Sequence, residues 1–345
     1  METAITAIRK KTLAVAAAVL VSAVACSTAQ NLTAAQKLDK AVDKLGQQTS
    51  LSFELGLDTD AATLKALDSN AAPGEEMPKQ VAELVAGARV SVTVQSKKPL
   101  QDSSATDITG MAMKVSGPDG GLLEYRQVDD WAYLRVGVKP LEKAADSQLP
   151  APEDLPPDAT DLKQVLSGGW VKMPADSLTK NTSGQESSSS AHPSAQARQK
   201  EVLNGLQRLI NREVQLKDTG TKDGADHITA TAPFRTLLTG LFDELRPLAA
   251  DLPQGAKLPT SKDLKDAPDK KITADFAIKN GTLNEVSVDL AALAQTKSDK
   301  FALLLRFGKG DWAITPARAT QIDPNALTQQ ILGGPALPRQ EEPAL

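Results

Sequence analysis

The chain has 345 residues with 39 Lys and Arg against 43 Asp and Glu, so its formal net charge is −4 at pH 7. Acids and bases are interspersed, without a basic tract, which removes the main electrostatic driving force for nucleic-acid binding and for polybasic attachment to anionic lipid. Aromatic residues make up only 3% of the chain, so the core must be aliphatic and a sugar-stacking surface is poorly supplied.

The first 26 residues have the order of a secretory signal. A short basic start (Arg9, Lys10 and Lys11) precedes an apolar run over 13–21, and small residues then lead to Cys26, the only cysteine of the chain. The apolar run is shorter than the roughly 20 residues of a membrane-spanning helix. A cysteine directly after a small residue at such a site resembles the lipobox of bacterial lipoproteins, in which the thiol is acylated and the signal is cut off.

This resemblance implies that residues 1–25 are a lipoprotein signal peptide and 26–32 an acylated stalk. Cys26 would carry the lipid, such as palmitate, and hold the protein on the outer face of the cell membrane. The alternative is an ordinary secreted protein with one stray cysteine, but an unpaired thiol in an exported protein needs an explanation. Loss of residues 1–25 takes away three basic groups and one acid, which leaves 36 against 42 and a formal charge of −6.

The N-terminal half reads as a helix followed by strands. Apolar residues recur at three- and four-residue spacing over 33–48, which predicts the helix. Asp129 and Asp130 between two alternating runs predict a tight hairpin, and 149–157 is a proline-rich loop. Alternation predicts strands at 51–57, 88–96, 108–115, 122–128, 131–136 and 170–173, and helical patterns occur within 60–87 and at 161–166.

The second half repeats this order. The Ser-rich segment 181–195 predicts a flexible loop, and amphipathic helices are predicted at 197–211 and 234–246. Asn280-Gly281 between two alternating runs predicts a hairpin with a type I′ turn. Strands are predicted at 214–217, 227–231, 272–279, 283–290, 301–307 and 312–314. The polar, proline-rich residues 316–345 predict a disordered tail.

These elements predict an α+β fold, in which a large antiparallel sheet is covered by helices on one face. The ordered part is expected to form one domain over 33–315. By length alone, about 290 ordered residues could form one large domain or two smaller ones.

The search for catalytic residues returns little. His192 lies in the Ser-rich loop and His227 near the start of a predicted strand, and no G-x-S-x-G precedes a helix. Glu124 with Asp130, or Asp223 with Asp226, could form a carboxylate pair, but such pairs are expected by chance among 43 acids. The segment 221–226 lacks the spacing of a calcium loop and is interpreted as a surface turn. We expect a non-enzymatic protein without metal or cofactor.

Several segments resemble the LppX/LprG-type lipoproteins of actinobacteria. The opening K-L-D-K-A-V-D-K-L of 37–45 followed by T-S-L-S-F, and the strand pair around D-D-W-A-Y-L-R-V at 129–136, are similar to that family. So are the Trp strand at 169–174, the late hairpin at 275–290 and the final strand at 309–317. The resemblance spans most of 33–320, and the chain is longer than those relatives at 60–87, 181–195 and 234–262.

The resemblance implies a curved antiparallel half-barrel, similar to LolA and LolB, with helices on its concave face. Between sheet and helices an apolar cavity would hold a lipid or lipoglycan at the cell envelope, in a monomeric protein. The cavity candidates are the apolar residues of the 234–246 helix, namely Leu238, Leu241, Phe242 and Leu245. Two alternatives stay open: a solid-core lipoprotein that acts through an envelope protein partner, and a carboxylate-dependent hydrolase.

Overall fold

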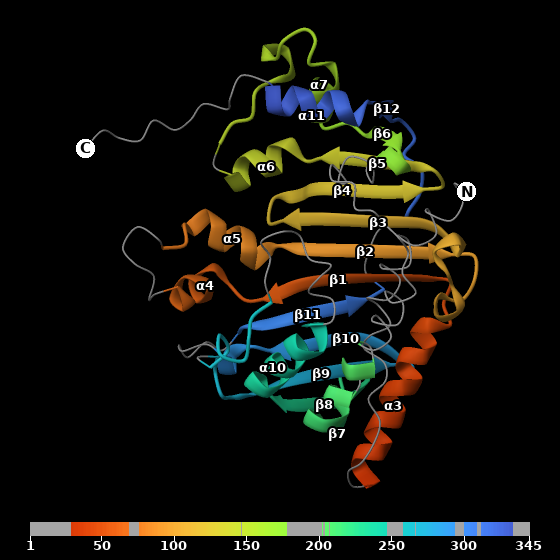
Figure 1. Cartoon of the computed structure of the whole chain (residues 1–345), viewed down its shortest axis with the longest axis vertical. Helices are drawn as coiled ribbons and strands as arrows, with labels where there is room; N and C mark the ends of the chain where they lie inside the picture. Colours follow the sequence, from red (N-terminus) through yellow and green to blue (C-terminus); the bar gives the residue numbers. More distant parts are fainter. Residues whose placement is uncertain are drawn as a thin grey trace.

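The computed structural model describes residues 29–68, 76–145, 147–177, 202, 204–206, 208–246, 258–265, 267–293, 300–308 and 312–333. In this part of the chain twelve strands form one sheet (Figure 1). The strands are β1 (Ser50–Asp58), β2 (Arg89–Ser96), β3 (Ile108–Gly117), β4 (Gly120–Val128), β5 (Trp131–Val136), β6 (Val171–Pro174), β7 (Gln215–Lys222), β8 (Ala225–Pro233), β9 (Lys271–Lys279), β10 (Thr282–Asp289), β11 (Ala302–Phe307) and β12 (Thr320–Gln321).

The strand order joins two antiparallel meanders into one open sheet. It runs β12-β6-β5-β4-β3-β2-β1-β11-β10-β9-β8-β7, and every neighbouring pair is antiparallel except β12 with β6. Because β11 lies between β10 and β1, a strand from late in the chain connects the N-terminal half to the C-terminal half. The predicted fold class, α+β with a large curved antiparallel sheet and helices on one face, is confirmed.

Two turns that the sequence predicts are formed. Asn280 and Gly281 have φ values of 54° and 70°, which a type I′ turn requires at both central positions, and they connect β9 to β10. Asp129 (φ 51°) connects β4 to β5. Asp223 (φ 53°) and Gly224 (φ 76°) connect β7 to β8, so 221–226 is a hairpin turn, as interpreted from the sequence.

Most helices of the described chain gather in three places, and α10 lies apart from them in contact with β8 (Figure 1). The first is α3, which contacts β7, β9 and β10. The second is the group of α4, α5 and α6 at one end of the strands, and the third is α7, which packs with α11 beyond β6. Their bounds are α3 (Ala29–Gly46), α4 (Ala61–Leu67), α5 (Lys79–Gly87), α6 (Val138–Ala145), α7 (Thr160–Leu166), α10 (Phe234–Leu245) and α11 (Pro324–Gly333).

The main hydrophobic core lies between α3 and the β7–β10 half of the sheet. One side of α3 is buried through small and branched residues, among them Ala34, Ala41 and Leu45. Their partners on the strands include Ile228 and Leu283, which are 0% and 2% exposed. Small side chains on the helix let its backbone approach the sheet closely, so this half is packed as a conventional core.

A second, smaller core corrects the prediction of a disordered tail over 316–345. Ile322 is buried together with Ala132, Val171 and Met173, and Leu327 of α11 packs against them. β12 adds in parallel to β6, and Gln330 accepts a hydrogen bond from the Leu162 N–H at 3.0 Å. The domain therefore extends past 315 to at least 333, because apolar residues inside the tail complete a core that earlier segments leave open.

Two other boundaries differ from the prediction. α3 begins at Ala29, inside the expected 26–32 stalk, because the intervening residues contain neither Gly nor Pro to stop a helix. The segment 312–314 is not a strand of the sheet. Its alternation arises because Ala313 is buried while Trp312 and Ile314 project outward. The predicted loop 181–195 lies outside the described residues.

Ile228→Ala should lower the free energy of unfolding by about 2–5 kcal/mol, because Ile228 is fully enclosed by α3 and neighbouring strands and truncation leaves a cavity. Urea unfolding followed by circular dichroism measures this. Thr229→Ala, on the other face of the same strand, is the control and should change it by less than about 1 kcal/mol. Equal losses of unfolding free energy in the two variants would show that the core is not under α3.

Asp218→Asn should weaken the attachment of α3 to β7 in a pH-dependent way. The Lys37 Nζ donates to Asp218 Oδ2 at 2.6 Å, and this bond together with the Gly220 N–H holds the pKa of Asp218 below its usual range. The carboxylate therefore contributes stability above about pH 4 and loses it as pH falls through the lowered pKa. Wild type should exceed the variant by about 0.2–1 kcal/mol at pH 7 and by nothing once the carboxyl is protonated. An equal difference at both pH values would contradict the assignment.

Candidate functional site

One face of β1, β2 and β3 carries a contiguous set of apolar side chains. The register pairs Leu55 with Val90 and Val90 with Val115. In the neighbouring rows, apolar residues of the three strands are paired in the same way. We call this set the apolar patch. It consists of Leu51, Phe53, Leu55, Leu57, Val90, Val92, Val94, Met111, Met113 and Val115.

The apolar side chains of these strands are more exposed than the polar face behind them, which is the reverse of what a solid core would give. None of the ten side chains of the apolar patch is buried, and Leu55 is 37% exposed. On the opposite, polar face of β2–β5, the side chains of Thr93, Ala112 and Tyr133 are buried, and Glu124 is only 7% exposed. Large contiguous apolar surface that stays in contact with water is unusual in a monomer and marks an interaction site.

The placement of the helices explains why the apolar patch stays open. α3 lies over the β7–β10 half, and only the edge of the patch, at Leu51, packs against that core. α4, α5 and α6 stand at the ends of the strands, where α5 contacts β1 and β3 and α6 contacts β4 (Figure 1). The described helices thus flank the apolar patch.

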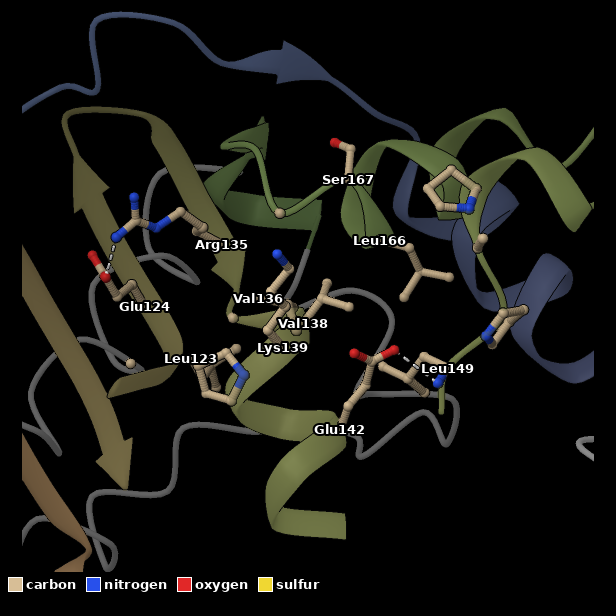
Figure 2. A pocket seen from close by; sticks show the side chains of 17 residues that line it. Leu123, Glu124, Arg135, Val136, Val138, Lys139, Glu142, Leu149, Leu166 and Ser167 are labelled. Atoms are coloured by element: carbon tan, nitrogen blue, oxygen red, sulfur yellow. Dashed lines mark hydrogen bonds and ion pairs between the residues drawn. The ribbon is translucent and has the colours of Figure 1, made fainter. Parts of the chain in front are cut away.

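A pocket of about 560 Å³ lies at the far side of the N-terminal half (Figure 2). β6 pairs with β5 only as far as Leu134, so the outer edge at Arg135 and Val136 has no strand beside it. α6, the segment 149–152 and the C-terminal end of α7 enclose the space next to this edge. Its apolar lining comprises Leu123, Val136, Val138, Pro140, Leu149, Pro150, Ala151, Pro152 and Leu166.

Polar groups shape the pocket at two points. Arg135 Nη2 donates to the Glu124 carboxylate at the sheet side (Figure 2). Glu142 Oε1 accepts the Leu149 N–H at 3.1 Å, which ties the 149–152 segment to α6. Gly137 makes the turn from β5 into α6 possible, because a Cβ there would lie 1.8 Å from the Gly121 carbonyl oxygen.

The apolar patch and the pocket are connected. A single row of paired residues crosses five strands, from Leu55 through Val90, Val115 and Leu123 to Val136, and its last two members line the pocket. On β1–β5 this face carries no charged side chain. Burial raises the pKa of the Tyr125 hydroxyl, and the strand register places this residue between Met113 and Leu134. The surface suits an uncharged, elongated ligand.

The four cavity residues proposed from the sequence lie on α10, outside this pocket. Leu238, Phe242 and Leu245 are half-buried and Leu241 is 36% exposed, so α10 buries none of its residues fully. Gly240 of α10 is in close contact with Leu209, since a Cβ there would lie 2.4 Å from Leu209 Cδ1. α10 therefore has an incompletely covered apolar face, and its role in ligand binding stays a proposal. Cys26 lies outside the described residues.

The described residues offer no assembled catalytic group. Glu124 is paired with Arg135, whereas Asp130 lies in the turn after β4. Asp226 accepts the Thr221 hydroxyl at 2.6 Å, and Asp223 occupies the turn itself. His227 Nδ1 lies 2.7 Å from Asp275 Oδ2 on the polar face, where it bridges β8 and β9.

Two further features are absent from the described residues. These residues contain no group of three or more His, Cys, Asp or Glu side chains placed to hold a metal ion. None of their helices combines the length and the apolar character that crossing a bilayer demands.

Sequence reasoning missed both the pocket and the exposure of the apolar patch. The pocket combines residues from 121 to 168, and α6, one of its walls, was not predicted because Pro140 interrupts a short pattern. The sequence did contain a signal for the pocket, because glycine and proline mark sharp turns around this strand end. These residues are Gly137, Pro140, Pro150 and Pro152. Periodicity correctly identified which side chains share a face, but periodicity is the same for a covered face and an open one.

No family model matches this chain, and no curated protein does. Among solved structures it is similar to lipoprotein LppX of Mycobacterium tuberculosis, with 12% identity, a TM-score of 0.30, and coverage of 80% of this chain and 93% of that one. It is also similar to LprF of Mycobacterium bovis, with 11% identity, a TM-score of 0.32, and coverage of 85% and 97%.

Proposed function

We propose that this protein is a lipid-anchored, extracytoplasmic lipoprotein that binds or carries an apolar ligand such as a lipid or lipoglycan. It acts without catalysis, as a monomer, on the outer face of the cell membrane. The observation that carries the proposal is the apolar patch, in which ten aliphatic, aromatic or Met side chains share one face of three adjacent strands and none is buried.

The dimensions of the apolar patch fit an acyl chain. Alternate residues along a strand are about 6.8 Å apart and neighbouring strands about 4.8 Å apart, so the patch measures roughly 20 Å by 10 Å. Covering it removes apolar surface from water at a gain of about 25 cal/mol per Å². The row from Leu55 to Val136 extends the same surface into the pocket, which offers one end of the ligand a recess that opens to solvent.

We propose that the half-covered α10 also takes part in ligand binding. Leu238, Leu241, Phe242 and Leu245 are apolar residues on one helix, and each retains exposed surface. A residue that faces a ligand has this property, whereas a residue of a solid core would be enclosed. We assign α10 to the ligand side on this ground.

Leu55→Asp should weaken binding of a dansyl-labelled fatty acid about tenfold or more, because a carboxylate in the apolar patch must be desolvated when an acyl chain covers it. The thermal midpoint should change little, since Leu55 is already 37% exposed. Fluorescence titration of the delipidated protein measures the affinity. Native mass spectrometry of the undelipidated protein should show retained lipid in wild type and less in the variant.

Ser52→Asp is the matched control, because it places the same charge on the polar face of the same strand. Leu241→Asp tests α10 in the same titration and should also reduce affinity. If wild type neither retains lipid nor binds the probe, or if Leu55→Asp and Ser52→Asp bind equally, the patch is not a ligand site.

Cys26→Ser should abolish incorporation of radiolabelled palmitate and shift the protein from the membrane to the soluble fraction, because serine offers no thiol for acylation. The anchor is motivated by the basic start, the apolar run and the single cysteine. Ser27→Ala is the control and should leave labelling unchanged. Undiminished labelling of the Cys26→Ser variant would place the lipid elsewhere.

A further inference from the structure

All three tryptophans of the chain lie on the polar face of the sheet, opposite the apolar patch. Trp131 begins β5 on that face, and Trp170 immediately precedes β6. Trp312 belongs to residues 312–320, which lead to β12 and which we call the strap.

The strap is held flat on the polar face by specific contacts. The Ala313 N–H donates to Gln95 Oε1 at 3.0 Å, and Arg126 Nη1 donates to the Ile314 carbonyl at 3.2 Å. Ala313 sits over Gly110, where a Cβ would come within 2.9 Å of the Ala313 Cβ. With Ala313 turned inward, Trp312 and Ile314 project into solvent and are 59% and 60% exposed.

Cations surround the other two indole rings. The guanidinium groups of Arg126 and Arg135 lie 4.7 Å and 5.1 Å from the ring centre of Trp170. The Lys172 ammonium lies 4.6 Å from the ring centre of Trp131. These contacts fix the positive groups beside the rings, in geometry that favours cation–π attraction.

The surface is locally basic although the chain is acidic. Its cations are Lys114, Arg126, Arg135, Lys172 and Arg318. Its acid is the buried Glu124, ion-paired with Arg135 and 3.8 Å from Arg126. With Asp129 and Asp130 of the adjoining turn included, five cations against three acids leave a formal charge of +2, in a chain whose total is −4.

We propose that this surface, the tryptophan face, docks on the headgroup region of an anionic lipid bilayer. Indole rings favour the membrane–water interface, and Lys and Arg near the surface each gain about 1 kcal/mol from anionic lipid. Trp312 and Ile314 are the exposed large apolar side chains here, too few for the core of a protein interface, which needs about 800 Å² on each partner. Shallow insertion between headgroups requires only such a small set.

The docking surface and the apolar patch lie on opposite faces of the same sheet, although Arg135 and Glu124 of the docking surface also line the pocket. The apolar patch contains no tryptophan, and the first tryptophan of the chain is residue 131. The part of the fluorescence change that depends on Trp312 therefore reports contact at the tryptophan face, because Trp312 is exposed on the strap and lines neither the patch nor the pocket.

The test titrates the full chain with vesicles of phosphatidylglycerol and phosphatidylcholine and follows tryptophan emission and acrylamide quenching. Anionic vesicles should shift emission to shorter wavelength and reduce quenching. Pure phosphatidylcholine, or anionic vesicles in 1 M salt, should produce little change. Trp312→Phe should lose most of the shift, whereas Trp131→Phe should keep it.

Lys172→Gln with Arg318→Gln should require several-fold more anionic lipid for half of the shift. Lys217→Gln, an exposed lysine on the polar face at the far edge of the sheet, should not. Circular dichroism confirms that each variant is folded. The proposal is overturned if anionic vesicles leave the emission unchanged, if pure phosphatidylcholine acts equally, or if Trp312→Phe retains the full shift.

Discussion

The pairing of β1 with β11 on one side and β2 on the other is the constraint on which the rest of the structure depends. The β1–β11 ladder joins residues as distant in sequence as Phe53 and Phe307, and the two ladders together set the register for both halves of the sheet. Because side chains alternate at every residue, a slip of one position in β1 would turn Leu51, Phe53 and Leu55 to the polar side. The α3 core at one end of the sheet and the apolar patch in its middle both require this one register.

The two halves of the sheet use the same apolar face differently. Over β7–β10, α3 covers that face and Ile228 and Leu283 are enclosed. Over β1–β3 the same face stays partly in water, while the polar face behind it buries Thr93 and Ala112. The stability of the domain therefore resides largely in the α3 half, and the N-terminal half is free to present apolar surface to a ligand.

The opposite faces would give the protein two kinds of contact with lipid. The apolar patch offers no charge and no hydrogen-bond partner for a headgroup, and so it suits acyl chains. The tryptophan face offers cations and indole rings and only two exposed large apolar side chains, and so it suits headgroups. A single sheet can carry both surfaces because alternation keeps the two sets of side chains on separate faces.

Local pattern determined much of this protein from the sequence by itself. Asn280-Gly281 and Asp129 define turns through their tolerance of positive φ, and strict alternation in β1, β2 and β9 places each apolar side chain on the correct face. Tertiary structure alone decided which part of that face is covered, because the position of α3 depends on partners more than 150 residues away. Tertiary structure also decided that the pocket forms and that the 320–333 segment is ordered. In the strap, the alternating pattern resembles a strand, but it reflects one buried alanine between two exposed side chains. The sequence shows no basic tract, yet folding gathers five separate cations onto one surface, because charges distant along the chain become neighbours only across paired strands.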